Sequence, residues 1–525
     1  MPCTTILVGS KASYNGATII ARNDDSGAGN FMPKKWVVVN PEEQPKTYVS
    51  VLSHVRIPLP ENPLRYTAMP NAVAGEGIWA AGGINEANVG MTASETITTN
   101  ERVLAADPLV EYQPADKENG IKEVRGGIGE EDLVSITLPY IKTAREGVIR
   151  LGMLHEKYGT YESNAIAFSD VNEIWWFESI GGHHWIAKRV PDDSVVIMPN
   201  QLGIDYFDLT DALGEGENYL CSKDLGEFLL DNHLALEIEN EEDEVGGAFN
   251  PRLAFGSHDD SDHVYNTPRA WFMARYLNPN SYIWDGPEAD FTPESDDIPW
   301  DLIPERKITS EDVKYLLSSH YQGTPYDPYA GYGDHRENGK YRSIGINRTD
   351  FMGMMEIRPD APAEAAGIEW IAYGSNAFNT MVPFFANVQD TPAYFKNTNG
   401  TVSTESFYWT SRLIAVLADS GFPKALFFIE DYQMKVQAKG RQIIKRVENE
   451  ILSANGLGRD TKASGKKLTA KAIQEKLAAK AIQEKLAAAN EEIAAMVKKE
   501  AEKTLKKVLD ESSNKMRNQY ARSDV

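Results

Sequence analysis

The feature that most constrains the fold is a hairpin in the first 25 residues of the chain. Two β-branched, apolar runs, residues 3–9 and 18–25, flank a short polar segment that ends in Asn15-Gly16. Asn-Gly between two such runs is a strong signal for the tight turn of a β-hairpin. The chain therefore starts with two paired antiparallel strands, and the first of them begins with a cysteine.

A thiol, a guanidinium and a carboxylate come together if this hairpin forms. Pairing of the strands brings Arg22 and Asp25 back towards Cys3. If Met1 and Pro2 are removed, the α-amine of Cys3, which titrates near ~8, can act as the base for its own thiol. Arg22 would then favour the thiolate by its charge, and Asp25 would orient the ammonium and the thiol. Without processing that nitrogen is an amide and cannot be the base.

The same residue types also occur without a catalytic role. A free cysteine is often a small buried apolar residue at the end of a strand. Arg-x-x-Asp after a strand is more often a surface ion pair or a turn. The spacing alone leaves both interpretations open.

Composition narrows the classes of partner. The chain has 525 residues, 42% of them hydrophobic, which is enough for a large core in one or two domains. A net charge of -24 argues against binding to nucleic acids or anionic membranes. The sequence shows neither a spanning apolar run nor the layout of a signal peptide. Its two cysteines, Cys3 and Cys221, provide no disulfide framework, and we expect a cytoplasmic protein in which Cys221 is structural.

The remaining pattern predicts a mixture of helices and strands. Acidic residues at 130–132 indicate the first turn of a helix that runs to about Arg145. A second helix follows over 144–158, or the two form one long helix with a break. Alternation and β-branched runs predict strands at 35–39, 48–52, 77–86, 89–94, 164–170, 173–178, 185–189, 194–198, 343–346, 353–358 and 368–373. Periodicity alone supports mixed α and β without specifying the layers.

The pair His183-His184 is the one pattern that suggests a metal. Adjacent residues on a strand point to opposite faces, and no further His or Cys stands at ligand spacing. We therefore predict a structural role for this pair and expect neither a metal nor a cofactor.

Longer blocks of sequence resemble the dipeptidase A family of bacterial cysteine peptidases. The blocks are CTTILVG at 3–9, IAR at 20–22, ASETITTN at 93–100, GGHHWIA at 181–187, YNTPRAW at 265–271, SHYQGTPYD at 319–327 and IGINR at 344–348. That family belongs to the N-terminal-nucleophile (Ntn) hydrolases, with penicillin V acylase and bile salt hydrolase. The resemblance implies an α+β fold, a four-layer αββα sandwich of two antiparallel sheets. It also implies a dipeptidase with broad side-chain tolerance.

The resemblance assigns roles to residues outside the hairpin. Asn200 stands where related acylases have an Asn whose amide helps to hold the oxyanion, although an Asn after Pro also forms turns. Arg269 corresponds to the family's second active-site arginine, which could bind the substrate carboxylate or form a structural ion pair. The second oxyanion donor is expected among three neighbours, Ser94, Glu95 and Thr96, unless these residues only line a strand. A dipeptide also needs a carboxylate for its ammonium, and Asp24, inside the hairpin, is a candidate.

The composition changes near residue 460. Residues 461–525 carry 15 Lys or Arg and 9 Asp or Glu, a net charge of +6, so the rest carries -30. Lys471–Ala479 is repeated word for word as Lys480–Ala488. Nine residues at ~100° each place the apolar residues of the two copies on opposite faces of a helix. We predict a removed propeptide at 1–2, a catalytic domain at 3–460 and a helical appendage at 461–525, which docks within the molecule or on a neighbouring subunit.

The sequence thus predicts a homo-oligomeric Ntn dipeptidase that acts on dipeptides through a thioester. Its predicted catalytic residues are Cys3, Arg22, Asp25, Asn200 and Arg269. Two alternatives stay open. One is an acylase on non-peptide amides, and the other is a catalytically silent structural or interaction protein with the same fold.

Overall fold

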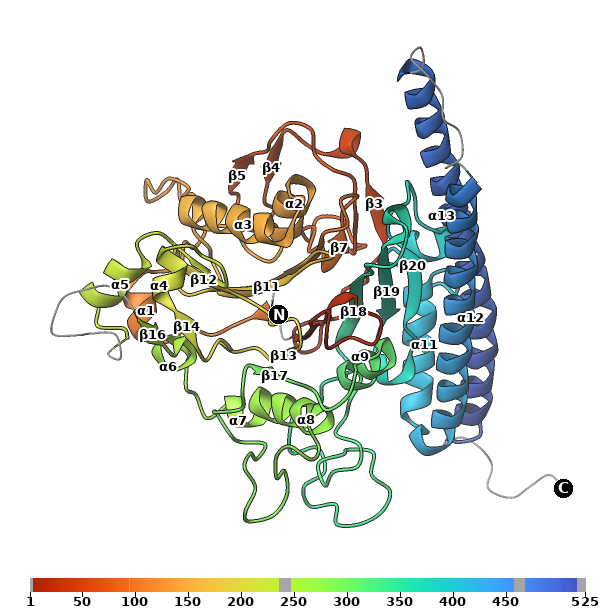
Figure 1. Ribbon diagram of the computed structural model, residues 1–525. Coiled ribbons are helices and arrows are strands. Elements are labelled where there is room, and N and C mark those ends of the chain that lie inside the picture. Colours follow the sequence, from red (N-terminus) through yellow and green to blue (C-terminus); the bar gives the residue numbers. More distant parts are fainter. Residues whose placement is uncertain (1–2, 94, 236–246, 458–467, 517–525) are drawn as a thin grey trace.

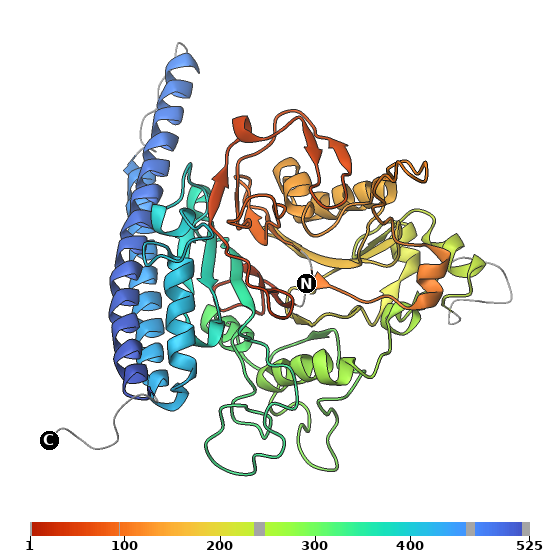
Figure 2. The same cartoon turned by 180° about the vertical axis from the view of Figure 1, so that it is seen from behind.

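The computed structural model describes residues 3–93, 95–235, 247–457 and 468–516. It is a mixed α and β protein in which two antiparallel sheets form the body and a column of helices stands along one side (Figure 1). The view from behind shows the same column beside the same body (Figure 2). None of the described helices is both long and apolar enough to cross a lipid bilayer.

The first sheet contains the predicted hairpin at its centre. Within the described residues it has seven strands, in the order β17 (Asp301–Leu302), β13 (Val195–Met198), β1 (Thr4–Val8), β2 (Thr18–Asp25), β18 (Thr349–Ile357), β19 (Gly367–Tyr373) and β20 (Val382–Phe385). Thr5 pairs with Arg22 across β1 and β2. Gly16 has a φ of 76°, so the predicted Asn-Gly turn uses the conformation that glycine permits.

The second sheet is built from the middle of the chain. Its described strands follow the order β15 (Tyr219–Cys221), β12 (Trp185–Arg189), β11 (Ile174–Ser179), β10 (Asn164–Ser169), β8 (Gly90–Thr92) and β7 (Gly82–Ile84), with β9 (Glu95–Thr96) also paired to β10. Smaller two-stranded sheets pair β3 (Val37–Val39) with β6 (Tyr66–Ala68), β4 (Thr47–Val49) with β5 (Arg56–Pro58), and β14 (Phe207–Asp208) with β16 (Ala248–Phe249).

The two large sheets pack face to face. β2 contacts β8 and β10, and β18 contacts β7 and β8. The approach is close because glycines line the contact: a Cβ added to Gly82 would lie 2.2 Å from the terminal methyl of Met355. Strands β1, β2 and β18 are buried along their whole length, which explains why they lack a polar alternation.

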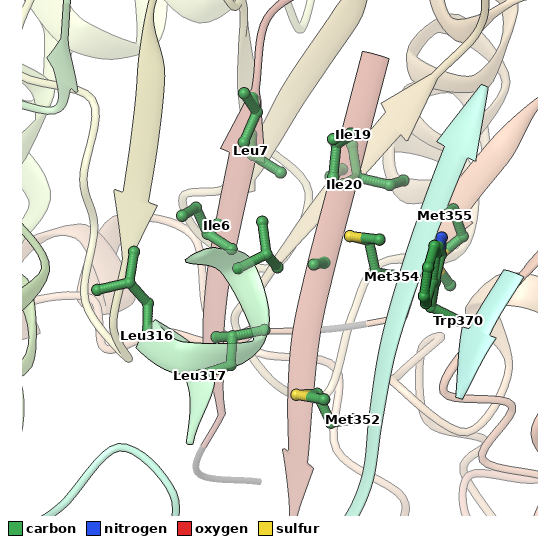
Figure 3. Packing of buried hydrophobic residues seen from close by; sticks show 14 of the residues in the cluster. Ile6, Leu7, Ile19, Ile20, Leu316, Leu317, Met352, Met354, Met355 and Trp370 are labelled. Atoms are coloured by element: carbon green, nitrogen blue, oxygen red, sulfur yellow. The ribbon is translucent and has the colours of Figure 1, made fainter. Parts of the chain in front are cut away.

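Helices cover both sheets. α3 (Ala144–Tyr158) packs on β10, β11 and β12, whereas α8 (Thr267–Leu277) packs on β13, and α9 (Ser310–Leu317) on β1 and β2. Figure 3 shows Leu316 and Leu317 of α9 beside Ile6 of β1, in the cluster that continues to Met354 and Trp370. The other described α-helices are α1 (Glu101–Ala106), α2 (Leu133–Thr137), α4 (Leu209–Leu213), α5 (Leu225–Asp231), α6 (Pro251–Phe255), α7 (Asp262–Tyr265) and α10 (Ala393–Lys396).

The C-terminal helices form the column. α11 (Phe407–Asp419), α12 (Phe422–Leu457) and α13 (Leu468–Ser513) pack on one another, and α12 and α13 also contact β20. The side chain of Asn490 bonds both backbone groups of Phe385, at 3.0 and 2.9 Å, so α13 covers the open edge of the first sheet. Leu486 of the second repeat copy is buried. In the first copy, the side chains up to residue 478 lie outside the described part of the chain.

Most of the predicted strands and helices are present, with two corrections. The helix predicted over 144–158 is present as α3, but the helix predicted from 130 to about Arg145 is much shorter. α2 spans only Leu133–Thr137, and a 3-10 helix follows it at Leu138–Tyr140. The strand predicted at 343–346 is wrong, because β18 begins only at Thr349. Gly345 donates instead to the carbonyl of Ser319, at 2.8 Å, which ties this segment to the loop after α9.

Candidate active site

The terminal hairpin brings Arg22 to Cys3, as its register predicts. Cys3 is fully buried just before β1, and Arg22 is fully buried in β2. Nη2 of Arg22 lies 2.7 Å from Sγ of Cys3. A guanidinium at this distance stabilises the negative charge of a thiolate.

Two carboxylates balance the charge of Arg22. Its Nη2 also lies 3.1 Å from Oδ1 of Asp24 and 3.1 Å from Oε1 of Glu130. Ligand atoms of Cys3, Asp24 and Glu130 lie within 4.8 Å of one another, and these are residue types that bind metals. Nη2 of Arg22 contacts all three groups, so a guanidinium already supplies the positive charge in this cluster.

Asp24 is shared between two cations. Lys34 Nζ lies 2.8 Å from its Oδ2, and both side chains are almost completely buried. Burial alone would raise the pKa of Asp24, but Lys34 and Arg22 outweigh it and hold that pKa below its usual value. Asp24 is therefore an ionised member of an internal network, which counts against its predicted role as receptor for a substrate ammonium.

Asn200 holds the backbone nitrogen of Cys3. Its Oδ1 accepts the N–H of Cys3 at 3.0 Å and an N–H of Arg269 at 2.8 Å, while its Nδ2 donates to the carbonyl of Thr96 at 2.9 Å. Two donors meet at Oδ1, so the network fixes which end of the amide faces Cys3. Asn200 follows β13, the neighbour of β1, and this places it beside the chain's first strand.

Arg269 ties the start of the chain to α8. Its Nη1 donates to the carbonyl of Cys3 and, at 2.6 Å, to Oγ1 of Thr4. Its Nη2 donates to the side-chain oxygens of Asn200 and Asn266, at 2.8 and 2.6 Å, and its Nε to the carbonyl of Tyr265 at 2.7 Å. A guanidinium has five N–H donors, and these five acceptors within the described chain match them in number. This favours a positioning role over capture of a substrate carboxylate.

Asp25 forms a separate pair at the end of β2. Its carboxylate accepts from Nη2 of Arg342 and, at 2.5 Å, from Oγ1 of Thr349. Burial would lower the pKa of Arg342, but Asp25 and Tyr265 outweigh it and hold that pKa above its usual value. Asp25 is thus engaged by a cation, Arg342, at the end of β2.

The remaining predicted site residues are placed as follows. Glu95 and Thr96 form β9, and the Thr96 carbonyl accepts from Asn200, whereas Ser94 lies outside the described residues.

His183 and His184 lie in the turn before β12, so both imidazoles reach one carboxylate, that of Asp107, at 3.0 and 2.7 Å. The premise that they sit on a strand and face opposite ways is wrong.

Cys221 lies in a different sheet from Cys3. It is half-buried in β15, and burial, with Glu156 and Asp224, raises the pKa of its thiol to about 12. A thiol that stays protonated at neutral pH is a poor nucleophile, in keeping with its predicted structural role.

Several residues of the cluster were not identified from the sequence. The acidic run at 130–132 predicts the first turn of a helix, but Glu130 lies before α2 and pairs with Arg22. Asn266 precedes α8, and its side chain binds the backbone of Asn200 on both sides. It accepts the N–H of Asn200 at 3.1 Å and donates to the carbonyl of Asn200 at 3.2 Å. Asn266 stands in the block that carried the resemblance, three residues before Arg269, and that spacing was the available signal.

The arrangement brings together the parts of a nucleophilic site. A buried thiol lies against a guanidinium, and the nitrogen of the same residue is held by an amide oxygen. If that nitrogen becomes a free amine, a base and a nucleophile belong to one residue.

The known proteins that this chain resembles are peptidases. The model of Peptidase family C69 matches residues 2–435. A dipeptidase of Bifidobacterium longum is 54% identical, with 100% of each chain covered. A probable dipeptidase A of Streptococcus pyogenes serotype M3 is 47% identical, again over 100% of each chain. Dipeptidase A of Lactobacillus helveticus is 43% identical over 86% of this chain and 90% of its own.

Proposed function

The chain belongs to peptidase family C69, and we propose that it is a cysteine-type dipeptidase whose nucleophile is the N-terminal residue of the processed chain, Cys3. The observation that carries this proposal is that both the thiol and the nitrogen of Cys3 are fixed by contacts to other residues. Its thiol lies 2.7 Å from Arg22 Nη2, and its nitrogen is bonded to Asn200 Oδ1 at 3.0 Å. The names of the relatives supply the substrate class, dipeptides.

The reaction begins after Met1 and Pro2 are removed. The α-amine of Cys3 accepts the thiol proton, and Arg22 stabilises the thiolate that results. Sγ attacks the carbonyl carbon of the dipeptide and forms a tetrahedral oxyanion. The C–N bond breaks, the leaving amine takes the proton from the Cys3 ammonium, and a thioester remains. Water, deprotonated by the same amine, then hydrolyses the thioester and restores Cys3.

Asn200 serves this reaction in two ways. Its Oδ1 orients the amine of Cys3, and its Nδ2 is the proposed donor to the oxyanion. The bond from Nδ2 to the Thr96 carbonyl fixes the orientation of the amide group. Loss of one oxyanion donor typically costs on the order of 10²–10³ in rate.

Arg269 and Asp25 act as positioning residues in this proposal. Arg269 fixes the carbonyl of Cys3 and the side chain of Asn200. Asp25 holds Arg342 at the end of β2, three residues after Arg22. The two sheets face each other, with α3 packed on one and α9 on the other. This arrangement is consistent with the four-layer Ntn-hydrolase sandwich, which we propose as the fold family.

The first test is the intact mass of the protein purified from its native source, together with its dipeptidase activity. We expect the mass of a chain that begins at Cys3. Active protein that retains Pro2 would contradict the mechanism, because the nitrogen of Cys3 would then be an amide. Cys3→Ala should reduce dipeptide hydrolysis to background. Cys221→Ala is the matched control and should stay within about twofold of the wild type, because its thiol is protonated at neutral pH.

A comparison of two substrates separates the dipeptidase from an acylase. An unblocked dipeptide and its N-acetylated form present the same amide bond but differ in the charge at the amino end. A dipeptidase should hydrolyse the unblocked form much faster. Faster hydrolysis of the acetylated form would favour the acylase, and no turnover of either by correctly processed protein would favour a silent protein of the same fold.

A further inference from the structure

A cavity lies away from the proposed catalytic residues. It has a volume of about 690 Å³ and is formed mainly by α9 and α12, and none of Cys3, Arg22, Asn200 or Arg269 lines it. This volume is in the range of sites that bind small molecules. Its walls combine apolar side chains of α12 with amide side chains, and one buried lysine.

Among the described residues, that lysine, Lys314, has no counter-ion. It is 7% exposed, and Nζ donates to the backbone carbonyl of Asn376 at 2.9 Å. No carboxylate in the described part of the chain forms an ion pair with it. Other buried lysines do have such partners: Lys34 pairs with Asp24 at 2.8 Å, and Lys188 with Asp301 at 3.7 Å. A buried ammonium without a nearby anion is costly, so this position is unusual for a lysine.

The other charged groups on the cavity wall are paired or exposed. Glu311 pairs with Arg441 at 3.0 Å, and Asp327 with His320 at 2.8 Å, while Glu430 is exposed on α12. Burial lowers the pKa of Lys314 to about 7, and none of these carboxylates offsets this effect of burial. An anion that entered the cavity would restore the missing charge and favour the protonated amine.

We propose that this cavity binds the carboxylate of a small acid with an apolar body, and that Lys314 is the cation that receives it. The apolar body would lie on Phe422, Leu426 and Met434, which line the same cavity. The amide groups of Gln322 and Gln437, also on the wall, can donate to the carboxylate. A free amino acid with an aliphatic side chain and a short branched fatty acid share this chemistry.

The site is connected to the catalytic strand through Asn376. The backbone carbonyl of Asn376 accepts from Lys314, and its side-chain Nδ2 donates to Oδ1 of Asn23 at 2.7 Å. Asn23 is the neighbour of Arg22 in β2. The proposal concerns binding alone, and it stands or falls independently of the proposed function.

Chemical modification followed residue by residue tests the proposal. Cyanate is a small reagent that carbamylates neutral amines, and peptide mass spectrometry reports each lysine separately. At pH 7 we expect Lys314 to be modified, and saturating 4-methylpentanoate or L-leucine to slow its modification by about fivefold or more. Lys188, buried beside Asp301, is the matched control and should be unaffected by either acid.

Each outcome is decisive. Protection of Lys314 by either acid supports the site, and the more effective acid identifies which source of carboxylate it prefers. Protection by neither acid overturns the proposal. Failure of cyanate to modify Lys314 even at pH 9 also overturns it, because an amine that this reagent cannot reach cannot receive a larger acid.

Calorimetry on variants provides the second readout. Lys314→Met should abolish the binding heat of 4-methylpentanoate, and Lys188→Met should preserve it. If Lys314→Met does not fold, Lys314→Gln keeps the hydrogen bond to the Asn376 carbonyl and removes the charge. Wild-type affinity in the folded Lys314 variant would overturn the proposal.

Discussion

Asn200 accepts the backbone N–H of Cys3 at 3.0 Å across 197 residues of sequence. The nitrogen that the proposed mechanism uses as its base is thus held by the same side chain that is proposed to donate to the oxyanion. Substitutions at Asn200 can separate the two roles, because its oxygen and its nitrogen have different partners.

Asn200→Asp keeps an acceptor for Cys3 and Arg269 but removes the Nδ2 donor. We expect kcat for a dipeptide to fall on the order of 10²–10³, with a much smaller change in KM, because the lost bond forms in the transition state. Intact mass should show that Met1 and Pro2 are still removed. Asn200→Ala, which loses both functions, should be at least as impaired. Activity of Asn200→Asp within about threefold of wild type would exclude Nδ2 as the oxyanion donor.

Arg269→Lys tests whether this arginine positions the chain start or binds substrate. A lysine has three donors and cannot satisfy five acceptors, so we expect a lower melting temperature and a lower kcat with little change in KM. Each lost charged hydrogen bond is worth about 1.5–3 kcal/mol.

A dipeptide and its C-terminal amide provide the control for this experiment. If Arg269 binds the substrate carboxylate, the variant should lose activity on the dipeptide far more than on the amide, and KM should rise. A positioning role predicts equal losses on both substrates.

Asp25→Asn should act through Arg342. The substitution leaves a guanidinium whose side chain is 5% exposed without its carboxylate, and breaking a buried pair costs about 3–5 kcal/mol. We expect the double variant Asp25→Asn/Arg342→Met to recover part of this stability in urea unfolding, which would demonstrate the coupling. Loss of activity with unchanged stability in the single variant would instead indicate that Asp25 acts directly on Cys3.

The hairpin and the meeting of Arg22 with Cys3 follow from local sequence. Residues 9–17 join β1 to β2, and the register of this pairing fixes which side chains are neighbours. Asn200 and Arg269 reach Cys3 from 197 and 266 residues away, and no local pattern encodes such contacts. Their roles were predicted from the family resemblance alone, as was the pairing of two sheets.

Other residues were misjudged because tertiary contacts override local patterns. Ser343-Ile344-Gly345-Ile346 has the alternation of a strand, yet a Cβ on Gly345 would lie 2.7 Å from the backbone of Ser318. The carbonyl of Ile344 accepts from the side chain of Asn23, at 3.2 Å. The segment is thus committed to loop contacts beside β2. Glu130 likewise fits a helix start by composition, whereas its partner is a guanidinium 108 residues earlier.

Glu369 should make stability depend on pH. It is fully buried in β19, where its carboxylate accepts from Trp36 Nε1 at 2.7 Å, and burial raises the pKa of Glu369 to about 7. The folded state therefore binds a proton that the unfolded state releases between about pH 4.5 and 7, and stability falls as the pH rises through this window. The loss from this one group should reach about 3 kcal/mol at pH 8.5.

Glu369→Gln isolates this contribution, because glutamine keeps an acceptor for Trp36 and does not titrate. In urea unfolding, the stability of the variant relative to wild type should increase by about 3 kcal/mol between pH 4 and pH 8.5. Glu111→Gln, at an exposed position, should show a constant difference over the same range. A constant difference for Glu369→Gln as well would mean that the pKa of Glu369 is the same in the folded and unfolded states, with the hydrogen bond from Trp36 offsetting the effect of burial.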